Sequence, residues 1–208
     1  MLVCKLGYIP SRQDEYCPST PYGHSKQIGE TLVRSLVSNK FKWVIVRPTS
    51  IWGPWFSTPY KDFFCMIKRG SYLHPLGCRI LRSYGFVLNT VFQLEAIQRD
   101  CCIQLSGDTV YLSDYEPLEI FNWATLIQLD MGAKPIKQLP LLFFKMAAYI
   151  GNFLIHLGFK KFPLNSFRLQ NILTSAVYDT NPLSDLSGPL PYSVKDGVHI
   201  TNKWLEQN

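Results

Sequence analysis

Apolar and polar positions follow one another with periods that predict alternating helices and short strands. Over residues 21–38 the apolar positions recur at helical spacing and form one stripe, made of Ile28, Leu32, Val33, Leu36 and Val37. Thr20 is a candidate cap for this helix, and Pro21 suits its first turn. Residues 41–46 form a short apolar run with β-branched members, which predicts a strand buried on both faces, as in a parallel sheet.

A helix followed by a buried strand is half of a βαβ unit, and the rest of the chain continues in the same mixed style. Further strands are predicted at residues 85–88, 109–112 and 135–139. Helices are predicted at residues 60–68, 89–98, 117–130, 141–157, 166–173 and 193–207. The predicted fold class is therefore α/β, with a smaller mixed lobe after about residue 70.

The composition is that of a packed globular protein, since 47% of the 208 residues are hydrophobic and 17% are charged. The net charge is +6, but the positive residues are scattered along the chain, so no nucleic-acid partner is predicted. The six cysteines show no C-x-x-C spacing. We therefore expect free thiols in a reducing compartment and no metal site.

Two features bear on localisation. The N-terminus has no apolar segment of the length found in a signal peptide, which predicts a cytoplasmic protein. The one long apolar stretch, residues 139–157, contains Lys145, Asn152 and His156. We expect this stretch to form a packed or membrane-surface helix rather than a membrane span.

Candidate chemistry begins with Tyr22 and Lys26, which lie four residues apart at the start of a predicted helix and so share one face. A tyrosine hydroxyl has a reference pKa of about 10, which makes it a poor base at neutral pH. A neighbouring ammonium group and a helix N-terminus both favour the phenolate, which can then remove a proton from a sugar hydroxyl. Taken alone, the spacing also fits a helix-edge tyrosine beside a solvated lysine.

The surrounding residues resemble a known family. The chain reads Pro21-Tyr22-Gly23-His24-Ser25-Lys26, then Gly29-Glu30, and after the buried strand Arg47-Pro48-Thr49-Ser50-Ile51-Trp52-Gly53-Pro54. This combination resembles the extended short-chain dehydrogenase/reductase family, specifically its NAD-dependent epimerase/dehydratase group. The resemblance is strongest over residues 16–54 and continues through Arg82-Ser83-Tyr84-Gly85, Gly107-Asp108-Thr109 and the C-terminal residues.

The resemblance implies an architecture as well as an activity. It predicts the C-terminal part of a Rossmann-like, doubly wound parallel sheet in residues 1–70. Residues 71–208 would be mostly a smaller mixed α/β substrate-binding lobe, with some segments returning to the first domain. The implied activity is NAD(P)-dependent epimerisation, dehydration or reduction of a nucleotide sugar, with NAD or NADP as cofactor. Relatives often dimerise through the helix that carries the Tyr-Lys pair, so a homodimer is possible.

Residue roles follow from the same resemblance. Tyr22 would be the catalytic acid/base, and Lys26 its partner and a contact to the cofactor ribose. Pro48 and Thr49 would line the nicotinamide end of the cofactor. Ser50, Trp52 and Arg82 would face the substrate, and Arg82 would lie near its diphosphate; an ordinary surface cation fits Arg82 equally well.

The sequence also departs from the family pattern. It contains no Gly-x-x-Gly-x-x-Gly turn of the kind that approaches a pyrophosphate, and the family's catalytic Ser or Thr would fall at or before Met1. Met1 to Val3 resemble the end of a buried strand. We therefore expect an N-terminally truncated member that binds NAD poorly, is inactive or nearly so, and exposes an apolar sheet edge.

Two alternatives remain. The apolar stretch 139–157 and the aromatic loop 52–56 also suit a hydroxysteroid or sterol dehydrogenase built on the same frame. The missing cofactor turn suits a non-catalytic binding module that has kept the Tyr-Lys pair.

Overall fold

The computed structural model describes residues 15–36, 42–100, 104–158 and 164–207. The expected strand at residues 1–3, and Val37 of the apolar stripe, lie outside these ranges. The chain divides into two compact units, the first drawn from residues 1–56, 82–118 and 176–208 and the second from residues 57–81 and 119–175. The domain boundary expected at residue 70 stays a prediction. Parallel strand pairing joins later segments of the chain to the first unit.

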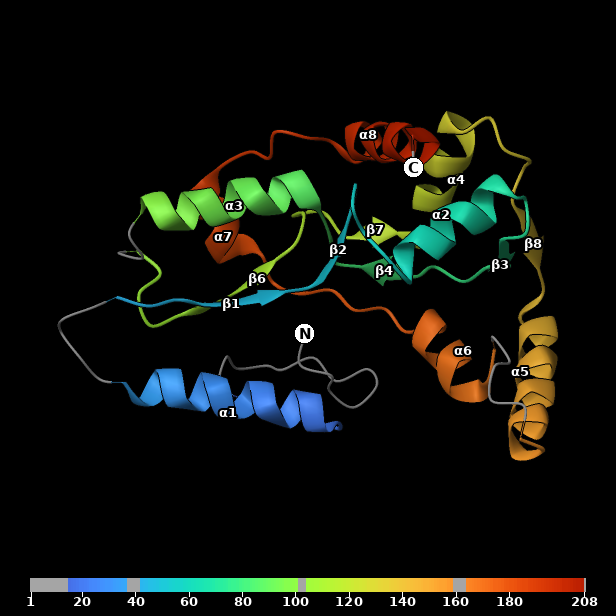
Figure 1. Ribbon diagram of the computed structural model, residues 1–208, viewed down its shortest axis with the longest axis horizontal. Helices are drawn as coiled ribbons and strands as arrows, with labels where there is room; N and C mark the ends of the chain where they lie inside the picture. Colours follow the sequence, from blue (N-terminus) through green and yellow to red (C-terminus); the bar gives the residue numbers. More distant parts are fainter. Residues whose placement is uncertain (1–14, 37–41, 101–103, 159–163, 208) are drawn as a thin grey trace. The chain divides into compact units, whose positions relative to one another are not determined.

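The first unit contains four strands and four helices among its described residues (Figure 1). The strands are β1 (Ile45–Pro48), β2 (Ser50–Trp52), β5 (Tyr84–Phe86) and β6 (Thr109–Leu112). The helices are α1 (Pro21–Ser35), α3 (Val87–Arg99), α7 (Asn181–Ser187) and α8 (Val194–Gln207). The predicted strand at residues 109–112 is confirmed, whereas α3 begins at Val87, inside the strand predicted for residues 85–88.

Parallel strand pairing, expected for a Rossmann-like sheet, is confirmed. Strand β1 pairs with β6 in the register Ile45 to Thr109, and β2 pairs with β5 in the register Ser50 to Tyr84. Each of the four sheets among the described residues has two strands. Both pairs join segments far apart in the sequence, as parallel strands require.

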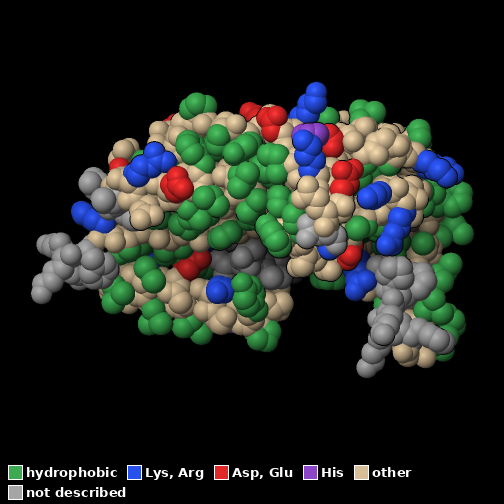
Figure 2. Space-filling view, turned by 45° about the horizontal axis from the view of Figure 1, so that its top comes forward, with side chains coloured by type: hydrophobic (Ala, Val, Ile, Leu, Met, Phe, Trp, Pro, Cys, Tyr) green, Lys and Arg blue, Asp and Glu red, His purple; other side chains and the backbone are tan. Residues whose placement is uncertain are grey.

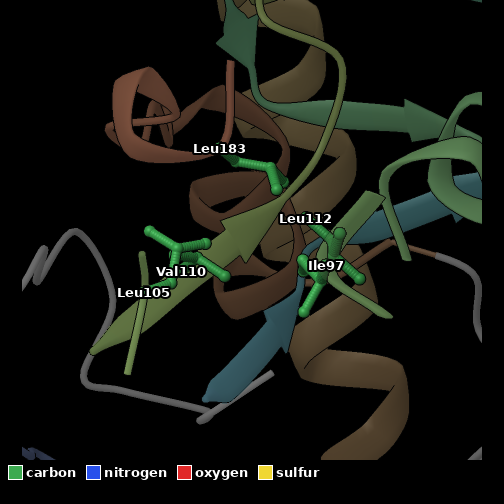
Figure 3. Packing of buried hydrophobic residues seen from close by; sticks show 5 residues of the cluster. All are labelled: Ile97, Leu105, Val110, Leu112 and Leu183. Carbon is green, nitrogen blue, oxygen red and sulfur yellow. The ribbon is translucent and has the colours of Figure 1, made fainter. Parts of the chain in front are cut away.

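The core of the first unit lies against β6. Figure 3 shows Leu112 of β6 beside Ile97 of α3, and Val110 of the same strand beside Leu105. Leu183 of α7 completes the cluster. All five side chains are buried, and Val44, Val46 and Leu186 pack against them. Successive strand side chains point to opposite faces, so burial of both Thr109 and Val110 indicates that β6 is covered on two sides.

The second unit is mixed α/β, as predicted for the smaller lobe. Its helices are α2 (Tyr60–Lys68), α4 (Ile120–Asp130), α5 (Leu141–His156) and α6 (Ser166–Leu173). Strands β3 (Leu73–Pro75) and β8 (Lys137–Leu139) pair in parallel, and the two-residue strands β4 (Leu81–Arg82) and β7 (Leu118–Glu119) lie where the chain crosses between units. Phe63 stacks on Trp123 with ring centroids 5.1 Å apart, and Phe64 meets the same indole edge-on.

Helix α1 buries a different face from the one that its apolar stripe indicates. Ile28, Leu32 and Leu36 are 60%, 61% and 53% exposed. The polar residues Glu30 and Arg34 instead lie toward the strands, where each finds a polar partner. The apolar stripe is therefore exposed at these three positions, because the Glu30–Arg47 ion pair holds the polar face of α1 against the strands.

Candidate active site

The first turn of α1 places Tyr22 and Lys26 side by side. Thr20 caps the helix by accepting a hydrogen bond from the Gly23 backbone N–H at 3.0 Å, and Pro21 occupies the first helical position. Lys26 Nζ lies 5.3 Å from the centroid of the Tyr22 ring. Both side chains are exposed, so a solute can reach the phenol and the ammonium together. The expectation that the two share one face of the helix is confirmed.

Glu30 and Arg47 fix α1 to the sheet. Glu30 Oε2 lies 2.7 Å from Arg47 Nη2, and Glu30 Oε1 accepts from Arg47 Nε at 3.0 Å, which makes a two-point ion pair. The Arg47 guanidinium also donates to the Tyr111 hydroxyl at 3.1 Å and lies over the rings of Tyr16 and Tyr111. Neither Glu30 nor Arg47 was among the residues singled out for a role, although Glu30 continues the four-residue spacing of Tyr22 and Lys26.

A second contact gives the direction of α1 relative to β1. Arg34 donates to Thr109, the residue that pairs with Ile45 at the start of β1. Arg34 thus lies over the beginning of β1 and Glu30 over Arg47, two residues further along. Four helical residues advance about 6 Å and two strand residues about 6.6 Å, so Lys26 comes level with Thr49 and Tyr22 with the residues that follow.

The Tyr-Lys pair therefore lies toward the carboxyl end of β1, the end at which ligands bind in open α/β sheets. Figure 1 shows α1 running back along β1, with its first turn toward the arrowhead of the strand. This arrangement brings Tyr22 and Lys26 to the same end of the unit as Pro48, Thr49 and Ser50.

The residues expected to line the cofactor occupy the end of β1. Pro48 is exposed. Thr49 joins β1 to β6, because its N–H and its Oγ1 both donate to the Leu112 carbonyl oxygen, at 3.0 and 2.9 Å. Ser50 opens β2 and is partly exposed.

The two remaining predicted residues lie in different surroundings. Trp52 is fully buried, with its ring 5.1 Å from that of Phe86 and in contact with Gly197, so its observed role is packing. Arg82 is partly exposed in β4 and pairs with Ala176 through a parallel bridge. For both residues, contact with a substrate stays a prediction.

A buried polar network, missed in the sequence, supports the carboxyl ends of β5 and β6. Asp114 Oδ1 accepts from the Asn89 side chain at 3.0 Å and from the Phe86 backbone N–H at 3.2 Å. Asn89 also bonds both backbone groups of Tyr192, ahead of α8. Burial raises the pKa of Asp114 to about 6, against the lowering effect of the two hydrogen bonds.

A metal centre has no support in the part of the chain that the structure describes. No group of three His, Cys, Asp or Glu side chains within residues 15–36, 42–100, 104–158 and 164–207 is placed to hold an ion. His74 has a structural role instead, because it is buried and both ring nitrogens have polar partners. Its Nδ1 lies 3.0 Å from the Tyr72 hydroxyl and its Nε2 lies 3.3 Å from the Cys78 carbonyl oxygen.

Comparison with known proteins gives a family match for part of the chain and solved structures of similar fold. Residues 6–76 match the family model described as the NAD dependent epimerase/dehydratase family. The UDP-glucuronic acid 4-epimerase from Bacillus cereus, solved with NAD, has 17% identical residues and a TM-score of 0.63, covering 99% of this chain and 58% of the epimerase. The UDP-glucose 4-epimerase from Thermotoga maritima has 14% identity and a TM-score of 0.59, covering 91% of this chain and 54% of that enzyme.

A dehydratase shares the same fold. The NAD-dependent NDP-hexosamine 5,6-dehydratase TunA has 13% identity and a TM-score of 0.61, covering 100% of this chain and 60% of TunA. None of the curated proteins matches the chain in sequence. The chain thus spans a little more than half the length of the solved enzymes that it resembles. Its resemblance to the NAD-dependent epimerase/dehydratase family is confirmed, by the family match over residues 6–76 and by the fold of these solved enzymes.

Proposed function

We propose that this chain carries the acid–base element of an NAD(P)-dependent epimerase, dehydratase or reductase that acts on a nucleotide sugar. The observation that carries the proposal is the Tyr22–Lys26 pair, exposed at the N-terminus of α1 and held level with the end of β1 by the Glu30–Arg47 ion pair. A phenol and an ammonium at the carboxyl end of parallel strands suit removal of a hydroxyl proton beside a bound dinucleotide.

Each residue has a distinct part in this proposal. NAD, when bound, supplies a hydride acceptor. Tyr22 takes the proton of the sugar hydroxyl whose carbon gives up the hydride, and returns it in the reverse step. The Lys26 ammonium stabilises the phenolate through its positive charge and contacts the cofactor ribose. Pro48 and Thr49 border the nicotinamide, and Thr49 holds its place through the two hydrogen bonds to Leu112.

A nucleotide sugar is the substrate class that the solved relatives support. One Bacillus cereus epimerase structure contains UDP-glucuronic acid together with NAD, and the Thermotoga maritima epimerase contains UDP-glucose. We assign Ser50 to the sugar side of the site and Arg82 to the diphosphate, and the fully buried Trp52 would support this side from within β2. Arg82 carries the positive charge that a diphosphate needs.

The test combines cofactor binding with residual turnover. Binding of NADH to the 208-residue chain is followed by fluorescence. Oxidation of UDP-glucuronic acid or UDP-glucose by added NAD is followed as the formation of NADH at high protein concentration. Turnover is expected to be low, because the sequence holds no Gly-x-x-Gly-x-x-Gly turn. Tyr22→Phe should lower this residual rate by at least about tenfold. Lys26→Met should also weaken NADH binding.

The matched control is Tyr149→Phe, because Tyr149 is another exposed tyrosine on a helix. It should leave both binding and rate unchanged. Equal rates for the unmodified chain and Tyr22→Phe would contradict the acid–base role. Equal affinity of the unmodified chain and Lys26→Met for NADH would contradict the contact between Lys26 and the cofactor ribose.

A hydroxysteroid substrate is the second candidate, and one aromatic group favours it. Trp55 is 83% exposed and lies 5.8 Å from the Trp204 ring, which Phe56 also contacts at 5.7 Å. An exposed ring that lies against a pair of partly buried ones suits a flat apolar substrate. Replacing the UDP-sugar by a 3β-hydroxysteroid in the same assay separates the two candidates, because the Tyr22→Phe effect should follow the true substrate.

A further inference from the structure

Helix α5 of the second unit exposes one broad apolar face. Six of its large apolar residues and the residue that follows the helix are between 54% and 75% exposed, namely Leu142, Phe143, Met146, Tyr149, Ile150, Phe153 and Leu157. At 3.6 residues per turn these positions fall within an arc of about 120°. A contiguous apolar surface of this kind marks an interaction site in a globular protein.

The rest of the α5 surface consists of a buried side and a polar border. Ala148 and Gly151 are buried on the opposite side, where α5 packs on α6. Asn152 reinforces that packing, because it donates to Ser166 Oγ at 2.7 Å and accepts from the Ser166 backbone N–H at 3.2 Å. Lys145, Asn152 and His156 share the narrow sector between the two, which gives the apolar face a polar border. Figure 2 shows hydrophobic side chains along the right-hand edge, over α5.

Charged residues are unevenly distributed along the part of the sequence that contains α5. Residues 131–178 contain no Asp or Glu, but they contain six basic residues: Lys134, Lys137, Lys145, Lys160, Lys161 and Arg168. Of the 21 Lys and Arg in the protein, these six leave 15, which equals the 15 Asp and Glu in the chain. The whole net charge of +6 therefore belongs to the segment that contains α5 and α6. Lys160 and Lys161 contribute through the sequence alone, since they lie outside the described residues.

We propose that the exposed face of α5 docks on the surface of a membrane rich in anionic phospholipid. The apolar side chains enter the boundary between headgroups and acyl chains, while the surrounding lysines meet the negative headgroups. The helix lies in the plane of the membrane. None of the described helices is long and apolar enough to cross a bilayer. With 16 residues, α5 spans about 24 Å, short of a hydrocarbon core of about 30 Å.

The charge distribution favours a membrane over a second copy of the chain. Two copies paired through α5 would bring two +6 segments together, and like charges across an interface are unfavourable. An anionic bilayer instead complements the charge and also takes up the apolar side chains, so one partner satisfies both features of the surface.

The test is co-sedimentation of the full 208-residue chain with vesicles. The vesicles are phosphatidylcholine alone, or phosphatidylcholine with about 30% phosphatidylserine. We expect binding at least about tenfold stronger to the anionic vesicles, and weaker binding as salt is raised. The variant Phe143→Ser/Met146→Ser/Phe153→Ser should lose this binding. Replacing Lys134, Lys137 and Lys145 by Gln should reduce the preference for phosphatidylserine.

The chain offers a closely matched control on α1. Ile28→Ser/Leu32→Ser/Leu36→Ser removes three apolar side chains of similar exposure, 60%, 61% and 53%, from a helix that carries Glu30. This control should bind vesicles as the unmodified chain does. The proposal is overturned if the two triple variants lose binding equally, or if both vesicle types bind equally well. Self-association without vesicle binding, abolished by the α5 variant, would overturn it in favour of a second copy.

Discussion

Glu30 on α1 and Arg47 on β1 form a two-point ion pair in which both side chains are largely removed from solvent, at 13% and 6% exposure. Hydrogen bonds to Glu30 and Tyr111 raise the pKa of Arg47 against the lowering effect of its burial, so the guanidinium stays charged. The pair links the helix that carries Tyr22 and Lys26 to the strand that ends in Pro48. It is therefore a positioning element for the candidate active site.

Removing one member of this pair should be costly, because the other charge would stay largely buried and lose its oppositely charged partner. Glu30→Gln is expected to lower the free energy of unfolding by about 3 kcal/mol, measured by urea denaturation. Glu95→Gln is the matched control, since Glu95 pairs with Arg99 at 3.5 Å with both side chains at least 60% exposed. This control should stay within about 0.5 kcal/mol. Equal, small effects of the two substitutions would show that Glu30–Arg47 does not hold α1 in place.

The sequence could predict the start of α1 and the common face of Tyr22 and Lys26, because Pro21, the Thr20 hydroxyl and a four-residue spacing act locally. It could not predict which face of α1 points inward. That choice depends on Arg47, 17 residues after Glu30, and on Thr109, 75 residues after Arg34. The spacing of apolar residues within α1 does not contain this information.

The same limit applies to the strands and to the site around them. The run Thr109–Leu112 was predictable because it is apolar and ends in polar residues, whereas β2 has only three residues and depends on pairing with β5. The buried Asp114 was not singled out, because its partners Asn89 and Tyr192 come from distant segments. Tertiary contacts, which a local pattern does not contain, decide such positions.

The exposure of the apolar stripe of α1 leads to a prediction for the residues that form it. Leu32→Gln should change the free energy of unfolding by no more than about 0.5 kcal/mol, since Leu32 is mostly exposed. Leu112→Ala, in the buried cluster of Figure 3, should cost about 2–5 kcal/mol. Both are measured by urea denaturation. A large loss for Leu32→Gln would mean that the apolar stripe, and not the ion pair, faces the core.

Asp114 should make stability depend on pH. Its pKa is raised from 3.8 to about 6 in the folded protein, so folding favours the protonated carboxyl. This contribution is fully present below pH 3.8, where both states are protonated, and it is lost as the pH rises through about 6. At about 1.4 kcal/mol per pKa unit, the loss is about 3 kcal/mol.

Asp114→Asn isolates this effect, because an amide oxygen can accept the same hydrogen bonds from Asn89 and Phe86. The difference in unfolding free energy between the unmodified protein and Asp114→Asn should shift by about 3 kcal/mol between pH 4 and pH 7 and then level off. Asp62→Asn, on the exposed surface of α2, controls for the loss of one carboxylate. Parallel stability curves for Asp114→Asn and the unmodified protein would contradict the role of burial.

Two substitutions of glycine by alanine should change the free energy of unfolding in opposite directions. A Cβ atom at Gly197 would lie 2.8 Å from the Trp52 ring and 3.0 Å from the Phe86 ring, and both rings are fully buried, so neither can move aside. Gly197→Ala is expected to lower the free energy of unfolding by about 1–3 kcal/mol. A Cβ atom at Gly29, inside α1, would meet nothing within 4 Å. Gly29→Ala should therefore stabilise the protein by about 0.5–1 kcal/mol, because alanine favours the helix. Thermal unfolding measures both effects, and a stabilising Gly197→Ala would show that Trp52 is not held rigidly against α8.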